Sequence, residues 1–361
     1  MSLNPLLISS SAGDCKIHMQ SLHDFDLWLP NGVTSVLVFR DNKIPEHCST
    51  PLQETCEERG IPFKLENLQG GEGLKDPNGW QNIIEAMGQA SLDRAGRVVV
   101  MGGGSLGDAV GFAASVWHRG TPWLAIPTTL LAMVDAHIGG KTAVHQGGVK
   151  NRIGSFHLPE QVIVDRSLLS TLPLEERRQG WAELIKAAWL SETPLLHQLE
   201  NDADAISEDL IPSPEVLRSA MSVKVSIVNE DLHESGRREI LNLGHTLAHA
   251  LEMEAIRNGT FLPHGSAVSI GMVFSARLAK ECGVGSDENV TRLIQLLQKV
   301  GLPTNMGPLD IDPVMKALRS DKKTRGGQLR WVLPVNPGNV IVDTVESSRV
   351  RRVLENLERD S

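Results

Sequence analysis

The first half of the chain alternates short apolar runs with stretches of helical periodicity, and this alternation limits the fold more than any other feature. The runs occupy residues 35–39, 97–101, 123–126 and 162–164 and are rich in valine and isoleucine. Strands that are apolar along their whole length, with helices between them, are typical of a parallel sheet covered on both faces. The sequence therefore predicts an α/β domain in this half.

The second half of the chain has a different pattern. From about Pro173 onward, apolar residues recur at helical spacing in residues 181–190, 214–228, 240–256, 265–281 and 290–300, and a β-like piece follows at 329–333. A chain of 361 residues is long enough for two domains. We therefore expect an α/β domain with a parallel sheet over residues 1–170, followed by a mostly α-helical domain over residues 171–361.

The charge and the cysteine content indicate which kinds of partner the protein binds and in which cellular compartment it lies. The formal net charge is -9 and no Lys/Arg cluster overrides it, which argues against nucleic-acid binding, although a local basic pocket could still bind a small anion. The four cysteines form no CxxC pair, so a reducing cytoplasm fits best. We find no basic, apolar leader and no apolar run long enough to span a membrane. We expect a cytoplasmic protein with no membrane or nucleic-acid partner.

A glycine-rich segment, GGGSLGD at residues 102–108, follows the run at 97–101 and precedes a helical stretch at 109–117. Glycines let backbone N–H groups approach a pyrophosphate, and a helix N-terminus favours its negative charge. A plain strand-to-helix turn is the alternative, and the acidic residue expected about 20 positions later is missing. Pro127-Thr128-Thr129 could add hydroxyl donors. The pattern favours dinucleotide binding in a non-standard arrangement.

Three histidines and one glutamate form a candidate metal site. His245 and His249 are four positions apart and so share one helix face, His264 starts the next helical stretch, and Glu183 lies in another. The spacing suits two ligands, or one ligand beside one catalytic group. A His/His/Glu set with an open position is what a catalytic zinc requires, and the absence of HExxH disfavours a zincin protease. Ordinary surface or core histidines remain the alternative.

Several cations lie beside loops and small residues, where a phosphate can approach backbone and side chain together. They are Arg119, Lys141, Lys150, Lys186, Lys224, Arg238, Lys322 and Lys323. Each of them taken singly could be a solvated surface charge, and Glu183 and Lys186, three apart, could be a simple helical ion pair. Spacing alone does not join them into one pocket.

Nine segments, in this order, resemble the 3-dehydroquinate synthase family of sugar-phosphate cyclases, and the likeness covers nearly the whole chain. They are residues 71–75 (GEGLK), 102–108, 127–135, 139–142 (GGKT), 150–154 (KNRIG), 182–186 (AELIK), 241–249 (LNLGHTLAH), 264–265 and 321–323 (DKK). The resemblance implies a lyase of the shikimate pathway to aromatic amino acids. Such a lyase converts 3-deoxy-D-arabino-heptulosonate 7-phosphate to 3-dehydroquinate and phosphate.

The resemblance also assigns roles to residues. Glu183, His245 and His264 are implied as zinc ligands, with cobalt as the alternative metal, which leaves His249 a catalytic or phosphate-side role. The implied NAD contacts are Asp41, Glu72, Lys75, Gly103, Gly104, Ser105, Asp108, Thr128, Thr129, Lys150 and Thr171. The implied substrate contacts are Asp135, Lys141, Asn151, Lys186, Lys224, Arg238, Asn242 and Lys322, which is preferred over Lys323.

Two further residues complete the implied set. Arg119 is similar to an arginine that reaches into a neighbouring subunit's site, which implies a homodimer, and Glu234 is similar to a proposed proton acceptor. In the family, NAD transiently oxidises one ring hydroxyl, phosphate is eliminated, the hydride returns, and an intramolecular aldol reaction closes the carbocycle. The metal serves as a Lewis acid.

The chain departs from the family pattern at a few positions. Ala136-His137 replaces the usual Ser-Ser, Ser266 replaces a glutamate, and Ala248 replaces a common glycine. The first change is expected to touch the wall of the NAD and substrate sites, and the second the support of the metal. Three alternatives therefore stay open. They are another sugar-phosphate cyclase (making 2-epi-5-epi-valiolone, 2-deoxy-scyllo-inosose or aminodehydroquinate), a glycerol-dehydrogenase-like metal-dependent oxidoreductase, and a binding protein without turnover.

Overall fold

The computed structural model describes residues 4–10, 13–191, 194–202, 205–307, 310–324 and 329–359, without the side chains of residues 26, 27, 320–324, 358 and 359. Contacts divide the chain into two compact units. The first unit holds Met1–Arg177 and Lys224–His233, and the second holds Arg178–Val223 and Glu234–Ser361. The sequence-based division between residues 170 and 171 stays a prediction.

The first unit is built on a seven-stranded sheet of order β1-β2-β9-β6-β5-β3-β4. Its strands are β1 (Leu6–Ser10), β2 (Gly13–Met19), β3 (Val36–Asp41), β4 (Phe63–Leu68), β5 (Arg97–Gly102), β6 (Trp123–Pro127) and β9 (Gln161–Val164). The β1–β2 pair is antiparallel, and the other neighbours pair in parallel. The predicted parallel sheet is confirmed, and the four predicted strands are β3, β5, β6 and β9.

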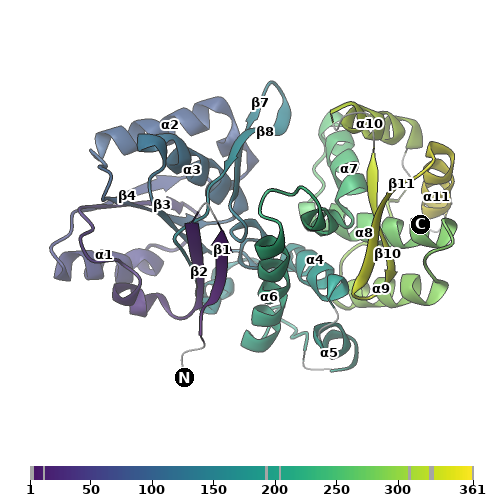
Figure 1. The fold of residues 1–361 in the computed structure, drawn as a ribbon, viewed down its shortest axis with the longest axis horizontal. Coiled ribbons are helices and arrows are strands. Elements are labelled where there is room, and N and C mark those ends of the chain that lie inside the picture. The colour runs from purple at the N-terminus through teal and green to yellow at the C-terminus, as the bar shows by residue number, and fades with distance from the viewer. Residues whose placement is uncertain are drawn as a thin grey trace. The chain divides into compact units, whose positions relative to one another are not determined.

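Helices cover both faces of this sheet, which explains why its central strands are apolar throughout. Val98–Met101 of β5 is fully buried. Helices α2 (Pro77–Gln89) and α3 (Gly104–Val116) lie on one side of the sheet, and α1 (Thr50–Glu58) lies on the other (Figure 1). Strand β4 escaped prediction because its sequence FKLENL is only half-buried and carries two charges.

The strand order reverses between β3 and β5. From β3 the chain moves outward to β4 at one edge, and then returns to β5 and continues through β6 toward the other edge. At such a switch point the loops after neighbouring parallel strands diverge and leave a crevice that binds ligands. The glycine-rich segment follows β5 at this point. A separate hairpin of β7 (Lys141–Gln146) and β8 (Val149–Phe156) extends from the unit (Figure 1).

The second unit is mostly helical, as predicted. It contains most of α4 (Leu174–Leu190) and α6 (Pro214–Glu230), together with α5 (Leu195–Asn201), α7 (His245–Arg257), α8 (His264–Glu281), α9 (Asp287–Lys299), α10 (Ile311–Thr324) and α11 (Ser347–Arg359). Helix α8 is buried along most of its length. A hairpin of β10 (Arg330–Asn336) and β11 (Asn339–Thr344) packs on it, with the rings of Phe274 and Trp331 5.2 Å apart.

One predicted helix begins later than expected. The periodic pattern suggested a helix over residues 240–256, but α7 starts at His245, and Arg237–Asn242 forms a 3-10 turn. Gly244, between the two, has a φ of 82°, which breaks the helix and is readily adopted only by glycine. This break places His245 on the first turn of α7.

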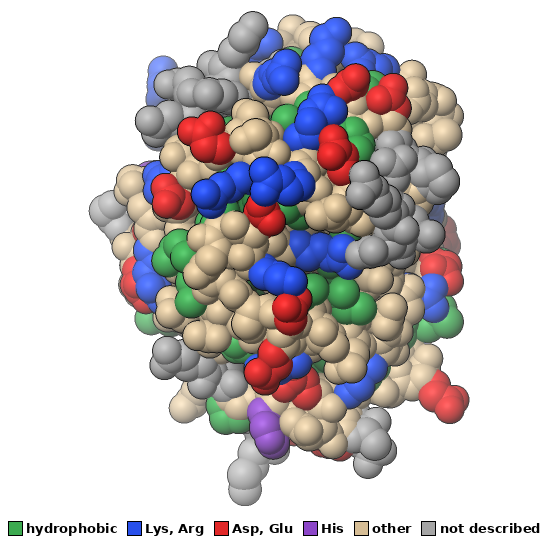
Figure 2. Space-filling model, turned by 90° about the vertical axis from the view of Figure 1, so that its right-hand side faces the viewer, with side chains coloured by type: hydrophobic (Ala, Val, Ile, Leu, Met, Phe, Trp, Pro, Cys, Tyr) green, Lys and Arg blue, Asp and Glu red, His purple; other side chains and the backbone are tan. Residues whose placement is uncertain are grey.

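The face in Figure 2 carries charges of both signs. Lys and Arg side chains lie among Asp and Glu side chains there. Pairs such as Arg352–Glu281, 2.6 Å between Nη1 and Oε1, and Arg351–Asp312 tie α11 to neighbouring helices. No helix among the described residues is long and apolar enough to cross a membrane.

Candidate active site

The second unit brings Glu183, His245 and His264 together. Glu183 lies in the middle of α4, and His245 and His264 are the first residues of α7 and α8. The Oε1 atom of Glu183 is 3.4 Å from Nε2 of His245 and 3.5 Å from Nε2 of His264. One ligand atom from each of the three residues lies within 4.8 Å of the others, so the trio could hold a metal ion.

Glu183 shows the strongest chemical sign of a metal site. Its side chain is 1% exposed, and neither carboxylate oxygen has a hydrogen-bond partner, although Lys186 forms an ion pair with Oε2. A buried carboxylate without hydrogen bonds is costly. A divalent cation bound beside two imidazoles would satisfy it, so the donor set fits a zinc or cobalt ion.

Close glycine contacts explain why the three side chains converge. A Cβ atom on Gly271 of α8 would lie 1.9 Å from the Gly244 carbonyl oxygen, just before α7. A Cβ atom on Gly265 would lie 2.2 Å from the Gln179 carbonyl oxygen of α4. Only glycine allows the starts of α7 and α8 to approach their neighbours this closely.

The two imidazoles of the trio have different electrostatic surroundings. Burial and the nearby Lys186 lower the pKa of His245 to about 3, so this ring is neutral and has a lone pair to donate. Burial also acts to lower the pKa of His264, but the neighbouring carboxylates of Glu183 and Glu252 overcome it and raise this pKa to about 10. Burial raises the pKa of Glu183, yet Lys186 and His245 outweigh it and hold this pKa well below its usual value.

Other predicted residues lie around the trio or near its helices. The His249 ring, on an exposed residue, is 5.7 Å from the His245 ring between centroids. Asn242 Nδ2 donates to Glu234 Oε1 at 2.8 Å, so the structure brings these two predicted residues together. Arg238 is 2% exposed and Lys186 is 3% exposed. Lys322 belongs to α10, but its side chain lies outside the described residues.

The glycine-rich segment forms a tight turn from β5 into α3, in the first unit. Gly103 is the N-cap of α3, and no side chain caps this helix. The backbone N–H groups and dipole of an uncapped N-terminus suit a phosphate. Ser105 Oγ donates to Glu72 Oε1 at 2.7 Å, which joins the start of α3 to the segment 71–75.

A network of charged and polar groups connects this helix start to the β7–β8 hairpin. Lys75, 2% exposed, places Nζ 2.5 Å from both Asp108 Oδ2 and Asn151 Oδ1. Lys150 Nζ lies 4.0 Å from Glu72 Oε2. Burial acts to raise the pKa of Glu72, but Lys75 and the Ser105 hydroxyl outweigh it and lower this pKa. Five predicted NAD contacts and one predicted substrate contact thus lie in one cluster.

Asp41 places an acidic side chain near the glycine turn, although it precedes that turn in the sequence. It is the last residue of β3, and the β3–β5 register ends with Arg40 opposite Met101, so Asp41 lies beside the start of the glycine turn. A Cβ atom on Gly70 would lie 2.0 Å from Asp41 Oδ2, so glycine makes room for this carboxylate. In dinucleotide sites an acidic residue after a strand binds the ribose.

The remaining predicted residues of the first unit lie in several places. Lys224 Nζ is 2.6 Å from both the carbonyl oxygen and Oδ1 of Asp135. Thr128 N donates to the Gly102 carbonyl oxygen at 3.0 Å, and Thr129 lies against Gly103. Thr171 lines a separate cavity of about 190 Å³, away from the glycine turn residues. Lys141 is exposed at the start of β7.

Backbone strain coincides with three predicted site residues. Among the described residues, six that are not glycine have a positive φ: Ser91, His118, Arg119, Asn151, Leu210 and Glu234. Such conformations cost free energy and cluster at functional sites. Their presence at Arg119 (67°), Asn151 (52°) and Glu234 (56°) is consistent with roles beyond packing.

Two residues that sequence reasoning missed support the predicted ones. His145 Nε2 is 3.1 Å from Glu72 Oε2, and its Nδ1 accepts from the Asn151 backbone N–H at 3.1 Å. Glu252 Oε1 is 3.6 Å from His264 Nδ1. Glu252 follows His245 by seven positions and therefore shares its helix face, a signal that could have identified it. His145 sits at a bulge of the β7–β8 ladder, which the sequence does not reveal.

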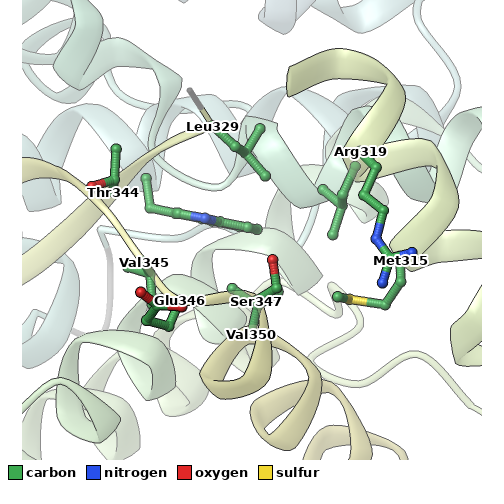
Figure 3. Close-up of a pocket in the computed structure, with 10 residues that line it drawn as sticks. Met315, Arg319, Leu329, Thr344, Val345, Glu346, Ser347 and Val350 are labelled. Carbon is green, nitrogen blue, oxygen red and sulfur yellow. The ribbon is translucent and has the colours of Figure 1, made fainter. Parts of the chain in front are cut away.

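A cavity of about 380 Å³ lies elsewhere in the second unit. Met315 and Arg319 of α10 face it, with Val345, Glu346 and Ser347 on the opposite side (Figure 3). None of the predicted site residues whose side chains the structure describes lines this cavity. The predicted site residues therefore form two main groups, each within one unit. They are the metal trio of Glu183, His245 and His264 in the second unit, and the glycine-turn cluster around Glu72, Lys75 and Asp108 in the first.

Comparison with known proteins identifies relatives. The N-terminal domain profile of 3-dehydroquinate synthase matches residues 66–179, and the C-terminal domain profile matches residues 180–324. A 3-dehydroquinate synthase of Nostoc punctiforme is 38% identical over 329 residues, covering 89% of this chain and 90% of that protein.

Solved structures are similar over almost the whole chain. A 2-epi-5-epi-valiolone synthase from Streptomyces hygroscopicus, with NAD+ and Zn2+ bound, has a TM-score of 0.87 and 28% identity, and the match covers 98% of each chain. A 2-deoxy-scyllo-inosose synthase has a TM-score of 0.83, 24% identity and 99% coverage of each chain, which supports the fold alone.

Proposed function

Because the chain belongs to the 3-dehydroquinate synthase family, we propose that it converts 3-deoxy-D-arabino-heptulosonate 7-phosphate to 3-dehydroquinate and phosphate. The observation that carries the proposal is the buried Glu183–His245–His264 trio with an unsatisfied carboxylate, in a chain that also has a dinucleotide-type glycine turn. A lyase that combines a metal with a recycled NAD needs both features.

NAD is the proposed cofactor of the first unit. When bound, it supplies the transient removal and the return of one hydride. The α3 N-terminus and Gly103–Gly104 bind the pyrophosphate, and Asp41 binds a ribose hydroxyl. Glu72, Lys75, Ser105 and Asp108 hold the segment 71–75 against this turn through the contacts described above. Thr128, Thr129, Lys150 and Thr171 complete the proposed set of contacts.

Glu183, His245 and His264 would hold a zinc ion, with cobalt as the alternative. When bound, the metal supplies a Lewis acid that polarises a substrate hydroxyl. Lys186, which is 3% exposed, forms an ion pair with Glu183 and balances its negative charge. Asn242 orients the substrate. Glu234, which accepts a 2.8 Å hydrogen bond from Asn242, takes up a substrate proton.

Cationic and amide side chains are proposed to bind the two anionic groups of the substrate, its carboxylate and its phosphate. Lys224, held by Asp135, and the buried Arg238 are suited to the substrate carboxylate. The phosphate is bound by His249, Lys141, Asn151 and Lys322. Neutralising the departing phosphate lowers the barrier to its elimination, because charge develops on it in the transition state.

The decisive experiment measures phosphate release from the heptulosonate phosphate in the presence of NAD and Zn2+. We expect metal-dependent release with dehydroquinate as product and no net NADH. A chelator-treated sample and the His245→Ala variant serve as controls, and both should be inactive. Zinc-loaded, NAD-bound protein that releases nothing would contradict the proposal.

A second substrate calls for a parallel assay because of the structural neighbour that makes 2-epi-5-epi-valiolone. Sedoheptulose 7-phosphate has no carboxylate, so the proposed roles of Arg238 and Lys224 predict poor turnover. Turnover of sedoheptulose 7-phosphate in preference to the heptulosonate would assign the chain to that alternative activity. Net NADH with a simple polyol would instead indicate an oxidoreductase.

We also propose that the protein is a cytoplasmic homodimer of the shikimate pathway in which Arg119 completes the partner's site. The strained, exposed backbone at Arg119 supports such a role. Mixing inactive Arg119→Ala and His245→Ala subunits tests it. If the arginine acts across the dimer, hybrid dimers regain one intact site and about a quarter of full activity returns. If it acts within its own subunit, hybrids stay inactive.

A further inference from the structure

The segment after Val134 packs directly against the glycine turn of the first unit. A Cβ atom on Gly104 would lie 2.8 Å from Ala136 Cβ, and a Cβ atom on Gly107 would lie 2.1 Å from His137 Nε2. The His137 side chain therefore fills the space over Gly107 that a larger residue would occupy. These two glycines make room for residues 136 and 137.

The His137 ring also forms a hydrogen bond with the turn. Its Nε2 is 3.2 Å from the carbonyl oxygen of Gly103, the N-cap of α3. A carbonyl oxygen only accepts, so Nε2 carries the hydrogen. The same carbonyl accepts the Gly107 N–H at 3.1 Å. The imidazole thus joins the start and the end of the first turn of α3.

Burial keeps this ring in one protonation state. His137 is 3% exposed, and its burial lowers the pKa to about 4 despite the Gly103 hydrogen bond. Its Nδ1 is buried and has no hydrogen-bond partner among the described residues. The ring is therefore directed at the glycine turn, and its contacts with the turn do not titrate near neutral pH.

We infer that His137 is a positioning residue for the dinucleotide-binding turn, so that the Ala136-His137 pair sets cofactor affinity and not the choice of sugar phosphate. The inference rests on the proposed NAD function of the turn. A small hydroxyl side chain at position 137 would leave Gly103 with one donor fewer and leave space over Gly107. The turn would then sample more conformations, and NAD binding would have to restrict them.

The test measures the dissociation constant of NAD, without turnover, for the full-length protein and its variants. His137→Ser should raise it about tenfold, the effect of one hydrogen bond and its packing. His137→Gln, which keeps an N–H donor, should recover part of the affinity. The matched control is His157→Ser, because His157 Nε2 contacts the Thr121 carbonyl oxygen at 3.0 Å, in the same unit but away from the turn. This control should stay within about twofold of wild type.

A double-mutant cycle checks the contact itself. Gly107→Ala should impair NAD binding strongly in the wild-type background and much less in the His137→Ser background, because the added Cβ collides with the imidazole. If His137→Ser does not fold, His137→Gln takes its place as the second background in which the effect of Gly107→Ala on NAD binding is measured. Equal effects of Gly107→Ala in both backgrounds would contradict the contact.

The outcomes separate this inference from the proposed function. A wild-type protein that does not bind NAD would contradict the proposed function. A His137→Ser variant that binds NAD as tightly as wild type would contradict the positioning role alone. At saturating NAD, His137→Ser should keep the wild-type ratio of kcat/KM for the two sugar phosphates, and a changed ratio would overturn the inference by showing that residue 137 selects the substrate.

Discussion

At the residue scale, the proposed metal trio of Glu183, His245 and His264 depends on neighbouring groups outside it. Glu252 holds His264 from the side opposite Glu183, since Nδ1 faces Glu252 and Nε2 faces Glu183. A carboxylate in this position fixes the orientation of a ligating imidazole and raises its basicity. Glu252 is 9% exposed, so solvent screens this interaction little.

Glu252→Gln should weaken Zn2+ binding by about 10- to 100-fold. Competition with a chromophoric chelator measures this affinity directly. Glu254→Gln is the matched control, because Glu254 is a buried carboxylate on the same helix that pairs with Arg257 at 2.8 Å. Similar zinc affinities in the two variants would argue against the role of Glu252.

Asp108 gives a prediction for the pH dependence of stability. Burial raises its pKa from 3.8 to about 6, and Glu72 adds to this, while Lys75 and Lys224 oppose it. Between about pH 4 and pH 6, Asp108 therefore keeps its proton in the folded protein and loses it in the unfolded chain. As a result, this group lowers the free energy of unfolding as pH rises from about 4 to 6.

Asp108→Asn removes this titration. Urea unfolding from pH 4 to 7 should show the variant gaining stability relative to wild type as pH rises, by up to about 3 kcal/mol, the equivalent of a shift of about two pKa units. A constant difference between the two proteins across this range would contradict the raised pKa.

At the element scale, helix starts determine the metal site. The proposed ligands His245 and His264 are the first residues of α7 and α8. Ser266 anchors α8 to α4 by donating its N–H and hydroxyl to Gln179 Oε1 at 2.7 and 3.1 Å. Ser266, which departs from the family pattern, thus fixes α8, which carries His264, to α4, which carries Glu183. Small shifts of either helix would separate the ligands.

Gly271→Ala tests this packing. A Cβ at position 271 would lie 1.9 Å from the Gly244 carbonyl oxygen, so α7 and α8 must move apart, at a cost of about 1–3 kcal/mol and with reduced zinc affinity. Gly88→Ala in α2 is the control, because its Cβ meets only Trp117 at an ordinary 3.7 Å and should stabilise the helix slightly. Denaturant unfolding and zinc titration measure both effects. Unchanged zinc affinity in Gly271→Ala would show that the close approach is not needed.

At the scale of the whole molecule, the two ligands are proposed to bind different compact units. Ligands stabilise the parts of a structure that they contact. Hydrogen–deuterium exchange should therefore show Zn2+ protecting the residues around Glu183 and the starts of α7 and α8. NAD should protect β5, the start of α3 and the segment 71–75. Protection of the same peptides by both ligands would contradict this assignment.

The sequence alone determined the fold class and the residue types of the candidate site. Continuous apolar runs reflect strands buried on both faces, and period-3.6 patterns reflect buried helix faces. They identified strands β3, β5, β6 and β9 and helices α3, α4, α6, α7, α8 and α9. Half-exposed elements such as β4 and the β7–β8 hairpin lack a strong pattern and were missed. Ordered motifs resembling one family pointed to the residues that the structure then clusters.

Only the tertiary structure decided which of these residues meet. Sequence spacing could not bring Lys224 to Asp135 across 89 positions or Glu183 to His264, because long-range packing and not local periodicity sets such contacts. The sequence lacks the acidic residue expected downstream of the glycine turn, and only the parallel-sheet topology shows that Asp41, at the end of an earlier strand, lies beside that turn. The direction of the His137 ring likewise depends on the missing side chain of Gly107, a contact between segments that no local pattern encodes.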